Sequence, residues 1–201
     1  MPVFTKPITQ GTMQADFAIV LDACVLANAG VCDLYLRLAE TPRLYLPRWS
    51  MTILEEVKRT QTTKLRRLFP EELADYWRRE VTAAFPEAVI DGFEHLLPVL
   101  TNSEKDRHVL AAAIQGGVSV IVTFNLKDFP EAALKSWKVA AVHPQDYLSA
   151  LYSMNPGVVL TKVAEIATAH GEEMQDALIH LGKSVPTFSR RLLQDTGRDF
   201  S

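Results

Sequence analysis

The segment NSEKDRHVLAAAIQGGVSVIVTFN, residues 102–125, carries the clearest structural signal of the chain. Its first part predicts an α-helix, because Ser103 is a favourable N-cap residue and Asp106, three positions later, completes a carboxylate variant of the capping box. The glycine pair at 116–117 is typical of a helix C-terminus, and residues 118–124 then form a run rich in Val and Ile. A helix joined to a buried strand by so short a connection indicates a β–α–β arrangement with a parallel sheet.

Three further segments are expected to add strands to this sheet. FAIVL, residues 17–21, is an apolar run; LYLP, residues 44–47, alternates and is closed by a proline; WKVAAV, residues 137–142, resembles a last strand. The periodicity predicts helices at 31–40, 51–60 with Ser50 as N-cap, 71–85, 156–169, 172–181 and 186–195. We therefore predict an α/β fold with a central, mostly parallel sheet, followed by helices at the C-terminus.

Polar side chains follow the predicted strands at the points where the strands end. Asp22 comes directly after the first strand, and Asn125 and Asp128 follow the strand at 118–124, while Asp106 begins the helix before it. Because the functional crevice of a parallel sheet lies outside the carboxyl ends of its strands, we expect these side chains at one rim. Like charges gathered there favour a bound cation, and Mg²⁺ and Mn²⁺ prefer carboxylate and water oxygens.

Each of these acids also has a purely structural interpretation. Asp22 can cap the turn after the first strand, and Asp106 is a favourable charge at a helix N-terminus, worth about 0.3–1 kcal/mol. Glu55 and Glu56 are a third source of carboxylate, but successive helical positions point about 100° apart, so at most one of them faces the site. Periodicity alone leaves open which one it is.

The composition describes one sizeable domain and a mildly acidic protein. The 201 residues are 48% hydrophobic, and the net charge of −3 argues against a generally basic nucleic-acid binder. One ten-residue stretch, 58–67, nevertheless contains five basic residues and no acid, and it begins two positions after Glu56. A solvated helix face is one explanation; the other is a track for the phosphates of a nucleic acid, with contacts from Arg59, Lys64 and Arg66.

The cysteines and the hydropathy pattern suggest a cytoplasmic protein without a membrane span. Cys24 and Cys32 have no metal-binding spacing, and we expect both to be reduced thiols. No apolar run approaches the roughly 20 residues needed to cross a bilayer, and residues 1–14 lack the layout of a signal peptide.

Four motifs, in this order, resemble the PIN-domain ribonucleases, and among these the VapC-type toxins of bacterial toxin–antitoxin pairs. They are LDACVLAN, SMTILEEVKR, EKDRHVLAAAIQGG and VIVTFNLKDF. The resemblance covers about residues 15–148, which we take as the nuclease domain, with an N-terminal arm at 1–14 and a helical extension at 150–201. It implies a three-layer α/β/α sandwich whose acids bind Mg²⁺ or Mn²⁺ and cleave RNA. It also implies a cognate antitoxin protein as partner, and homodimers are common in this family.

Position by position, the resemblance assigns Asp22 as the first acid of the family, Glu56 as the second and Asp106 as the third. The fourth position is often Asp in the family but is Asn125 here, and Asp128 is a nearby substitute. Cys24 stands where many relatives have an asparagine, so we expect a supporting hydrogen bond to be missing there. The predicted function is a metal-dependent endoribonuclease; the alternative is a PIN-like module that has lost catalysis and binds only RNA or a protein.

Overall fold

The protein is built around a small, entirely parallel sheet. The structure, a computed structural model, describes residues 16–64 and 70–197. The sheet has the order β2-β1-β3-β4, and neighbouring strands run parallel, with Val20 opposite Ile121 in the central pair. Its strands are β1 Ala18–Leu21, β2 Leu46–Arg48, β3 Val120–Val122 and β4 Ala140–Val142. The predicted α/β fold with a parallel sheet is confirmed.

Helices account for most of the remaining described chain. The α-helices are α1 Ala23–Leu26, α2 Ala29–Leu38, α3 Met51–Lys64, α4 Glu71–Ala84, α5 Arg107–Gln115, α6 Glu131–Leu134, α7 Pro144–Met154, α8 Pro156–His170, α9 Met174–Gly182 and α10 Pro186–Asp195. Short 3-10 helices are η1 Glu94–Val99, η2 Glu104–Asp106, η3 Leu126–Asp128 and η4 Lys135–Trp137. Among the described residues, no helix combines the length and the apolar character that a membrane crossing requires.

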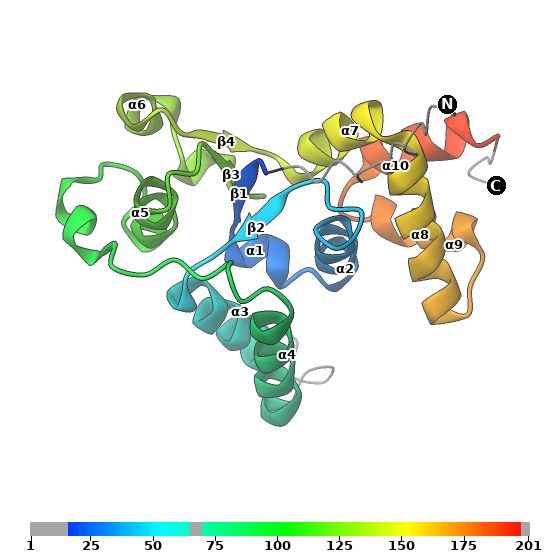
Figure 1. Ribbon diagram of the computed structural model, residues 1–201, viewed down its shortest axis with the longest axis horizontal. Coiled ribbons are helices and arrows are strands. Elements are labelled where there is room, and N and C mark those ends of the chain that lie inside the picture. The colour runs from blue at the N-terminus through cyan, green and yellow to red at the C-terminus, as the bar shows by residue number, and fades with distance from the viewer. Residues whose placement is uncertain (1–15, 65–69, 198–201) are drawn as a thin grey trace, which may run out of the picture.

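The helices cover the sheet on both sides and complete a three-layer sandwich. The α5 helix packs on β1 and β3, and Figure 1 shows it on one side of the sheet with α2 and α7 on the other. The α2 and α7 helices are joined by the buried hydroxyl of Tyr35, which donates to the carbonyl oxygen of Pro144 at 2.9 Å. The α3 and α4 helices pair with each other and project away from the sheet (Figure 1).

The C-terminal helices share the core of the sandwich. The α8 helix packs on α2 and α9, and buried residues of α8 and α10, such as Val163 and Phe188, belong to the same hydrophobic cluster as β1 and β3. The predicted change from nuclease domain to extension, at residues 148–150, falls inside α7. The predicted arm at 1–14 lies outside the described residues.

Some local predictions differ from the structure, and one is confirmed. The last strand, expected at 137–142, is residues 140–142, because Lys135–Trp137 form the 3-10 turn η4. The second strand is residues 46–48 rather than 44–47. The helix expected from Ser103 begins instead with the 3-10 turn η2, and the side chain of Ser103 makes no capping bond; Asp106 is the N-cap residue of α5, also without a side-chain cap. Ser50 does cap α3, because its Oγ accepts a hydrogen bond from the N–H of Ile53 at 3.2 Å.

Candidate functional site

The acidic site lies where the strand order reverses, between β1 and β3. The sheet extends from β1 to β2 in one direction and from β3 to β4 in the other, so the carboxyl ends of β1 and β3 border a topological switch point. Asp22 directly follows β1, and its backbone N–H donates to the carbonyl of Val122 at 3.1 Å. This bond keeps the first residue after β1 level with the end of β3, which places Thr123 beside Asp22.

Asp22 is a buried carboxylate held by two side chains. Only 3% of the residue is exposed, the hydroxyl of Thr123 donates to Oδ2 at 2.6 Å, and the thiol of Cys24 donates to the same oxygen at 3.2 Å. The expectation that Cys24 leaves a hydrogen bond missing is therefore wrong, since a thiol is a weak donor and is well placed here. Burial raises the pKa of Asp22, and the nearby charge of Asp106 adds a smaller increase.

Asp106 is the second buried carboxylate of the rim. The residue is 5% exposed, and its buried Oδ2 makes no hydrogen bond. The nearest cation is the Nζ of Lys105, at 3.4 Å, which is an ion-pair contact without hydrogen-bond geometry. Burying a carboxylate oxygen without a hydrogen-bond donor destabilises the folded protein unless a cation lies nearby. The carboxylate oxygens at this point therefore fit a metal ion.

Helix α3 brings Glu56, rather than Glu55, to this side of the molecule. Ile53, Leu54 and Val57 are fully buried, and this fixes the rotation of α3 about its axis. Glu56 then lies half-buried, 3.5 Å from the Nε2 of His108 and 3.6 Å from Arg59, whereas Glu55 points to α4 and pairs with Arg78. His108 is the main cause that lowers the pKa of Glu56, and the charges of Arg59 and Lys105 add to it.

The η3 turn brings Asn125 and Asp128 to the same rim. The N–H of Asn125 donates to the hydroxyl oxygen of Thr123 at 3.0 Å, so this hydroxyl links the residue to Asp22. The carbonyl of Asp128 accepts from the N–H of Ser103 at 3.2 Å, and its Oδ2 accepts from the Nζ of Lys105 at 3.0 Å. The turns η2 and η3 are therefore tied together beside the two buried carboxylates.

The five predicted site residues thus gather at one rim, but they do not form a closed cage. Within residues 16–64 and 70–197, no three His, Cys, Asp or Glu side chains are arranged so that they could hold an ion. Among the described residues Asp22 makes no ion pair, and Asp106 has only the Lys105 contact at 3.4 Å, which lacks hydrogen-bond geometry; Glu56 is 3.6 Å from Arg59, and Asp128 accepts a hydrogen bond from Lys105. Mg²⁺ commonly uses one or two carboxylates and completes its shell with waters and substrate phosphates, so two acids are sufficient.

Comparison with known proteins gives one informative match. The chain is 34% identical over 125 residues to a protein described as "Putative ribonuclease VapC50" from Mycobacterium tuberculosis, and the match covers 59% of this chain and 74% of the relative. The chain belongs to the VapC-type PIN-domain toxins. No family model matches the sequence, and no solved structure matches it.

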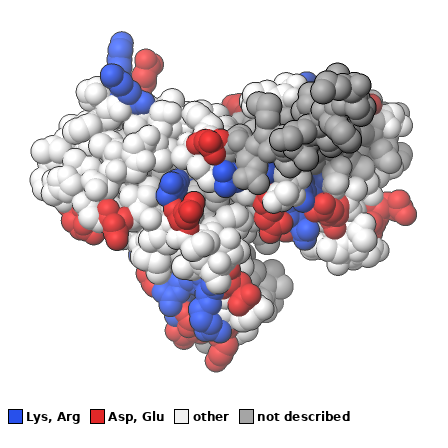
Figure 2. All heavy atoms as spheres, viewed as in Figure 1, with Lys and Arg blue, Asp and Glu red and all other residues white. Residues whose placement is uncertain are grey.

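In this VapC-type chain, the surface next to the acids is mixed in charge rather than uniformly basic. Figure 2 shows Lys and Arg gathered together with Asp and Glu over the projecting α3–α4 pair. Lys58 is occupied by the α4 acids Glu71 and Asp75, at 3.3 and 2.8 Å. Arg59 is 72% exposed beside Glu56, as a phosphate contact near the acids would require. The side chain of Lys64 and all of Arg66 lie outside the described residues.

Sequence reasoning missed three residues of this VapC-type site: Thr123, Lys105 and His108. Thr123 lies inside the strand predicted at 118–124, two positions before Asn125. His108 falls in the predicted helix without a site role, and its mostly buried ring contacts Glu56. The available signal was sequence adjacency, because Lys105 and His108 lie within two positions of Asp106.

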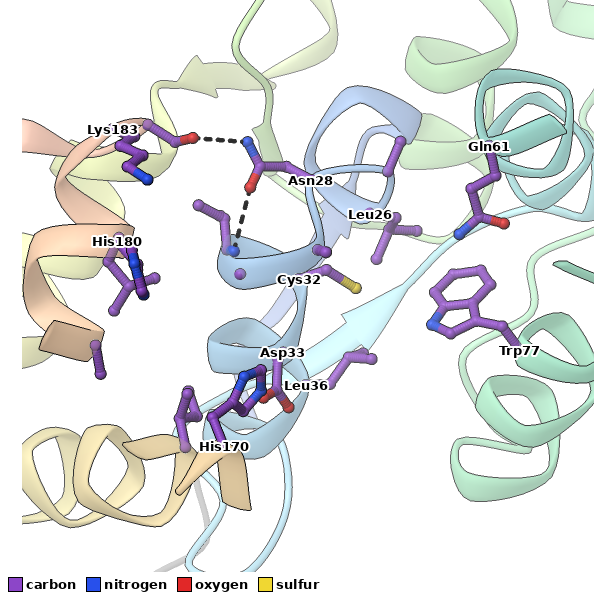
Figure 3. Close-up of a pocket in the computed structure, with 18 of the residues that line it drawn as sticks. Leu26, Asn28, Cys32, Asp33, Leu36, Gln61, Trp77, His170, His180 and Lys183 are labelled. Carbon is purple, nitrogen blue, oxygen red and sulfur yellow. Dashed lines mark hydrogen bonds between the residues drawn. The ribbon is translucent and has the colours of Figure 1, made fainter. Parts of the chain in front are cut away.

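A cavity of about 560 Å³ lies away from these acids, between α2, α9 and the α3–α4 pair. Figure 3 shows α2 between its two walls, with His180 and Lys183 on one side and Gln61 and Trp77 on the other. Asn28 also lines it, and its side-chain amide donates to the hydroxyl of Ser184 at 2.8 Å. None of Asp22, Glu56 and Asp106 lines this cavity, so it is separate from the acidic rim.

Proposed function

We propose that this protein is a metal-dependent endoribonuclease and the toxin of a toxin–antitoxin pair. The observation that carries the proposal is the pair of buried carboxylates, Asp22 and Asp106, at the switch point of a parallel sheet in a VapC-type chain. The relative is named as a ribonuclease, and its 34% identity to this chain supports the same class of activity.

Asp22, Glu56 and Asp106 would hold Mg²⁺, or Mn²⁺ as a substitute. A bound divalent ion supplies Lewis acidity, which activates water and offsets the charge that develops on the phosphate. Thr123 and Cys24 fix the orientation of Asp22 through their hydrogen bonds. Asn125 and Asp128 are suited to orienting a ligand or the attacking water, because the Thr123 and Lys105 contacts hold both beside the carboxylates.

Cleavage of RNA by the purified protein tests the proposal. Single-stranded or looped RNA is expected to be cut with Mg²⁺ or Mn²⁺, and EDTA is expected to stop the reaction. The double variant Asp22→Asn with Asp106→Asn removes both buried charges with little change in side-chain size. Cleavage that continues unchanged in the double variant contradicts the assignment.

The proposed partner is an antitoxin protein that inserts a cationic side chain among the carboxylates. Asp106 Oδ2 lacks a hydrogen-bond donor, and an Arg guanidinium pairs with carboxylates in a bidentate geometry. Expression of the toxin alone in a bacterial cytoplasm should arrest growth, and Asp22→Ala should relieve the arrest. Co-expression with the protein encoded by the neighbouring gene should restore growth.

A second candidate function is a PIN-like module that binds RNA or a protein without cleaving it. Asn125 in place of a fourth acid, and the lack of a ready-made set of three ligands among the described residues, favour it. Metal titration separates the two candidates, since a ligand that binds only the folded state raises the melting temperature by mass action. No rise at millimolar Mg²⁺ or Mn²⁺ supports the non-catalytic module.

A further inference from the structure

The side chain of Lys105 places an ammonium group beside the carboxylates of the acidic rim. Its Nζ lies 3.0 Å from Asp128 Oδ2 and 3.4 Å from Asp106 Oδ2, and its charge contributes to the lowered pKa of Glu56. One ammonium group therefore acts on acids from η2, η3 and α3. The side chain is nevertheless 67% exposed, so solvent and small ions reach it.

The two close contacts of Lys105 differ in quality. The contact with Asp128 satisfies hydrogen-bond geometry, whereas the contact with Asp106 does not and leaves Asp106 Oδ2 buried without a donor. The flexible stem of a lysine can turn its ammonium away from Asp106 while the bond to Asp128 persists. The weaker of the two contacts is thus the one at the carboxylate that best fits a metal.

We propose that Lys105 is the resident counter-cation of this rim and competes with a divalent metal for Asp106. This inference rests on the proposed function, because it requires a metal site at Asp22 and Asp106. Lys105 offsets the repulsion among the carboxylates when no metal is bound, and it lowers metal affinity because its ammonium must leave Asp106. It acts on the metal through Asp106 and is a positioning residue of the site.

Calorimetric titration of the full chain with Mg²⁺ and with Mn²⁺ tests the inference. Lys105→Met removes the charge and keeps an apolar stem, and Lys127→Met is the matched control. Lys127 is exposed in the neighbouring η3 turn and has no ion pair within the part of the chain that the structure describes. Lys105→Met should bind each metal about three- to fivefold more tightly than wild type, and Lys127→Met within about twofold, given the strength of a mostly exposed ion pair.

The melting temperature provides a second measurement of the same competition. Without metal, Lys105→Met should melt below wild type, because the carboxylates then repel one another without compensation. With saturating metal it should show the larger rise, because its affinity is higher. Lys105→Gln, which can still donate a hydrogen bond to Asp128, should change metal affinity in the same direction.

The sign of the affinity change decides the outcome. If Lys105→Met and Lys105→Gln bind metal no more tightly than Lys127→Met, the inference is overturned, and Lys105 is only a structural bridge between η2 and η3. If wild type and all variants fail to bind either metal, the metal site of the proposed function is itself wrong, and the inference fails with it. Tighter binding in both Lys105 variants, but not in the control, supports it.

Discussion

Asp22 and Glu56 are carboxylates of one rim with opposite responses to folding. Burial raises the pKa of Asp22, so its charged form is less favourable in the folded protein than in the unfolded chain. His108, Arg59 and Lys105 surround Glu56 with positive or polarisable groups and lower its pKa, so its charged form is favoured by folding. The charged form of Asp22 therefore destabilises the folded protein, whereas the charged form of Glu56 stabilises it.

We expect neutral replacements of these two acids to change stability in opposite directions at pH 7 in EDTA. A carboxyl whose pKa is higher in the folded protein than in the unfolded chain stabilises the folded state at pH values below its unfolded pKa, about 4 for Asp. This contribution is lost as the pH rises through the folded pKa. Asp22→Asn should therefore raise the melting temperature, on the order of 2–4 °C for each kcal/mol removed, and the gain should vanish near pH 4.

Glu56→Gln is the matched comparison for Asp22→Asn. A carboxyl whose pKa is lower in the folded protein than in the unfolded chain stabilises the folded state at pH values above its unfolded pKa, about 4.3 for Glu. This contribution is lost as the pH falls through the folded pKa. Glu56→Gln should therefore lower the melting temperature at pH 7, and the difference from wild type should shrink on acidification. Thermal melts of both variants at pH 7 and pH 4 check the pair; a shift of both in the same direction contradicts this account.

The two cysteines are expected to be unreactive in the folded protein. Burial is the main cause that raises the pKa of Cys24 and of Cys32 to about 12. At pH 8 only about one thiol in ten thousand is then ionised, and the thiolate is the nucleophile. Iodoacetamide at pH 8 should leave the native protein at its original mass and add two groups in urea. Rapid native alkylation of Cys24 argues that its thiol is not held against Asp22.

Helix α3 serves both the core and the site, because its faces have different neighbours. Ile53, Leu54 and Val57 are fully buried, which leaves Glu56 toward the rim and Lys58 toward α4. Adjacent residues of one helix thus have different roles: Arg59 is exposed beside the acids, while Lys58 holds α4 through Glu71 and Asp75.

The basic residues of and after α3 are expected to set the salt dependence of RNA binding. If Arg59, Lys64 and Arg66 contact phosphates, affinity falls with salt with a log–log slope near −0.7 for each contact on a single strand. Lys64→Gln with Arg66→Gln should flatten the slope by roughly one to two, with metal affinity and melting temperature nearly unchanged. Filter binding of single-stranded RNA across a salt series measures it.

Lys58→Gln is the control for this measurement, because Lys58 is paired with α4. It should leave the slope unchanged, since its ammonium is occupied by Glu71 and Asp75. If Lys64→Gln with Arg66→Gln keeps the wild-type slope, the basic stretch does not contact RNA and is only a solvated helix face. A slope that flattens for Lys58→Gln as well indicates general charge rather than a defined track.

At the scale of the whole molecule, the C-terminal helices and the sandwich are expected to unfold together. Their buried residues form one hydrophobic cluster, and α8 packs directly on α2. Phe188 of α10 is fully buried and meets the ring of Tyr152 edge-on, with centroids 6.5 Å apart. Phe188→Ala should cost about 3–5 kcal/mol and lower the single melting transition by on the order of 10 °C.

Calorimetry and denaturant titration check this expectation. Coincident transitions by circular dichroism and tryptophan fluorescence are expected in wild type and in the variant, because one core unfolds as one unit. The folded variant should keep its metal affinity, since Phe188 touches none of the rim acids. Two separated transitions would mean that α8, α9 and α10 form an independent unit.

The sequence by itself determined the elements and the rim that they border. Runs such as FAIVL and VSVIVTF predict strands of a parallel sheet, and β1 and β3 form within them; the acids that follow such strands are expected at the carboxyl ends of the sheet. The three C-terminal helices were also predictable, because proline opens two of them and their apolar periodicity is regular. These features depend on local sequence, so they can be predicted without knowledge of how the elements pack.

Only the tertiary structure decided which side chains support the acids. Periodicity left Glu55 and Glu56 open and only the family resemblance favoured Glu56; the rotation that the core imposes on α3 places Glu56 toward the rim and turns Glu55 to α4. Thr123, Cys24, Lys105 and His108 became part of the site because η2, η3 and the two central strands converge there. Contacts between residues about 100 positions apart depend on how the elements dock, since docking is fixed by the whole core rather than by any one segment.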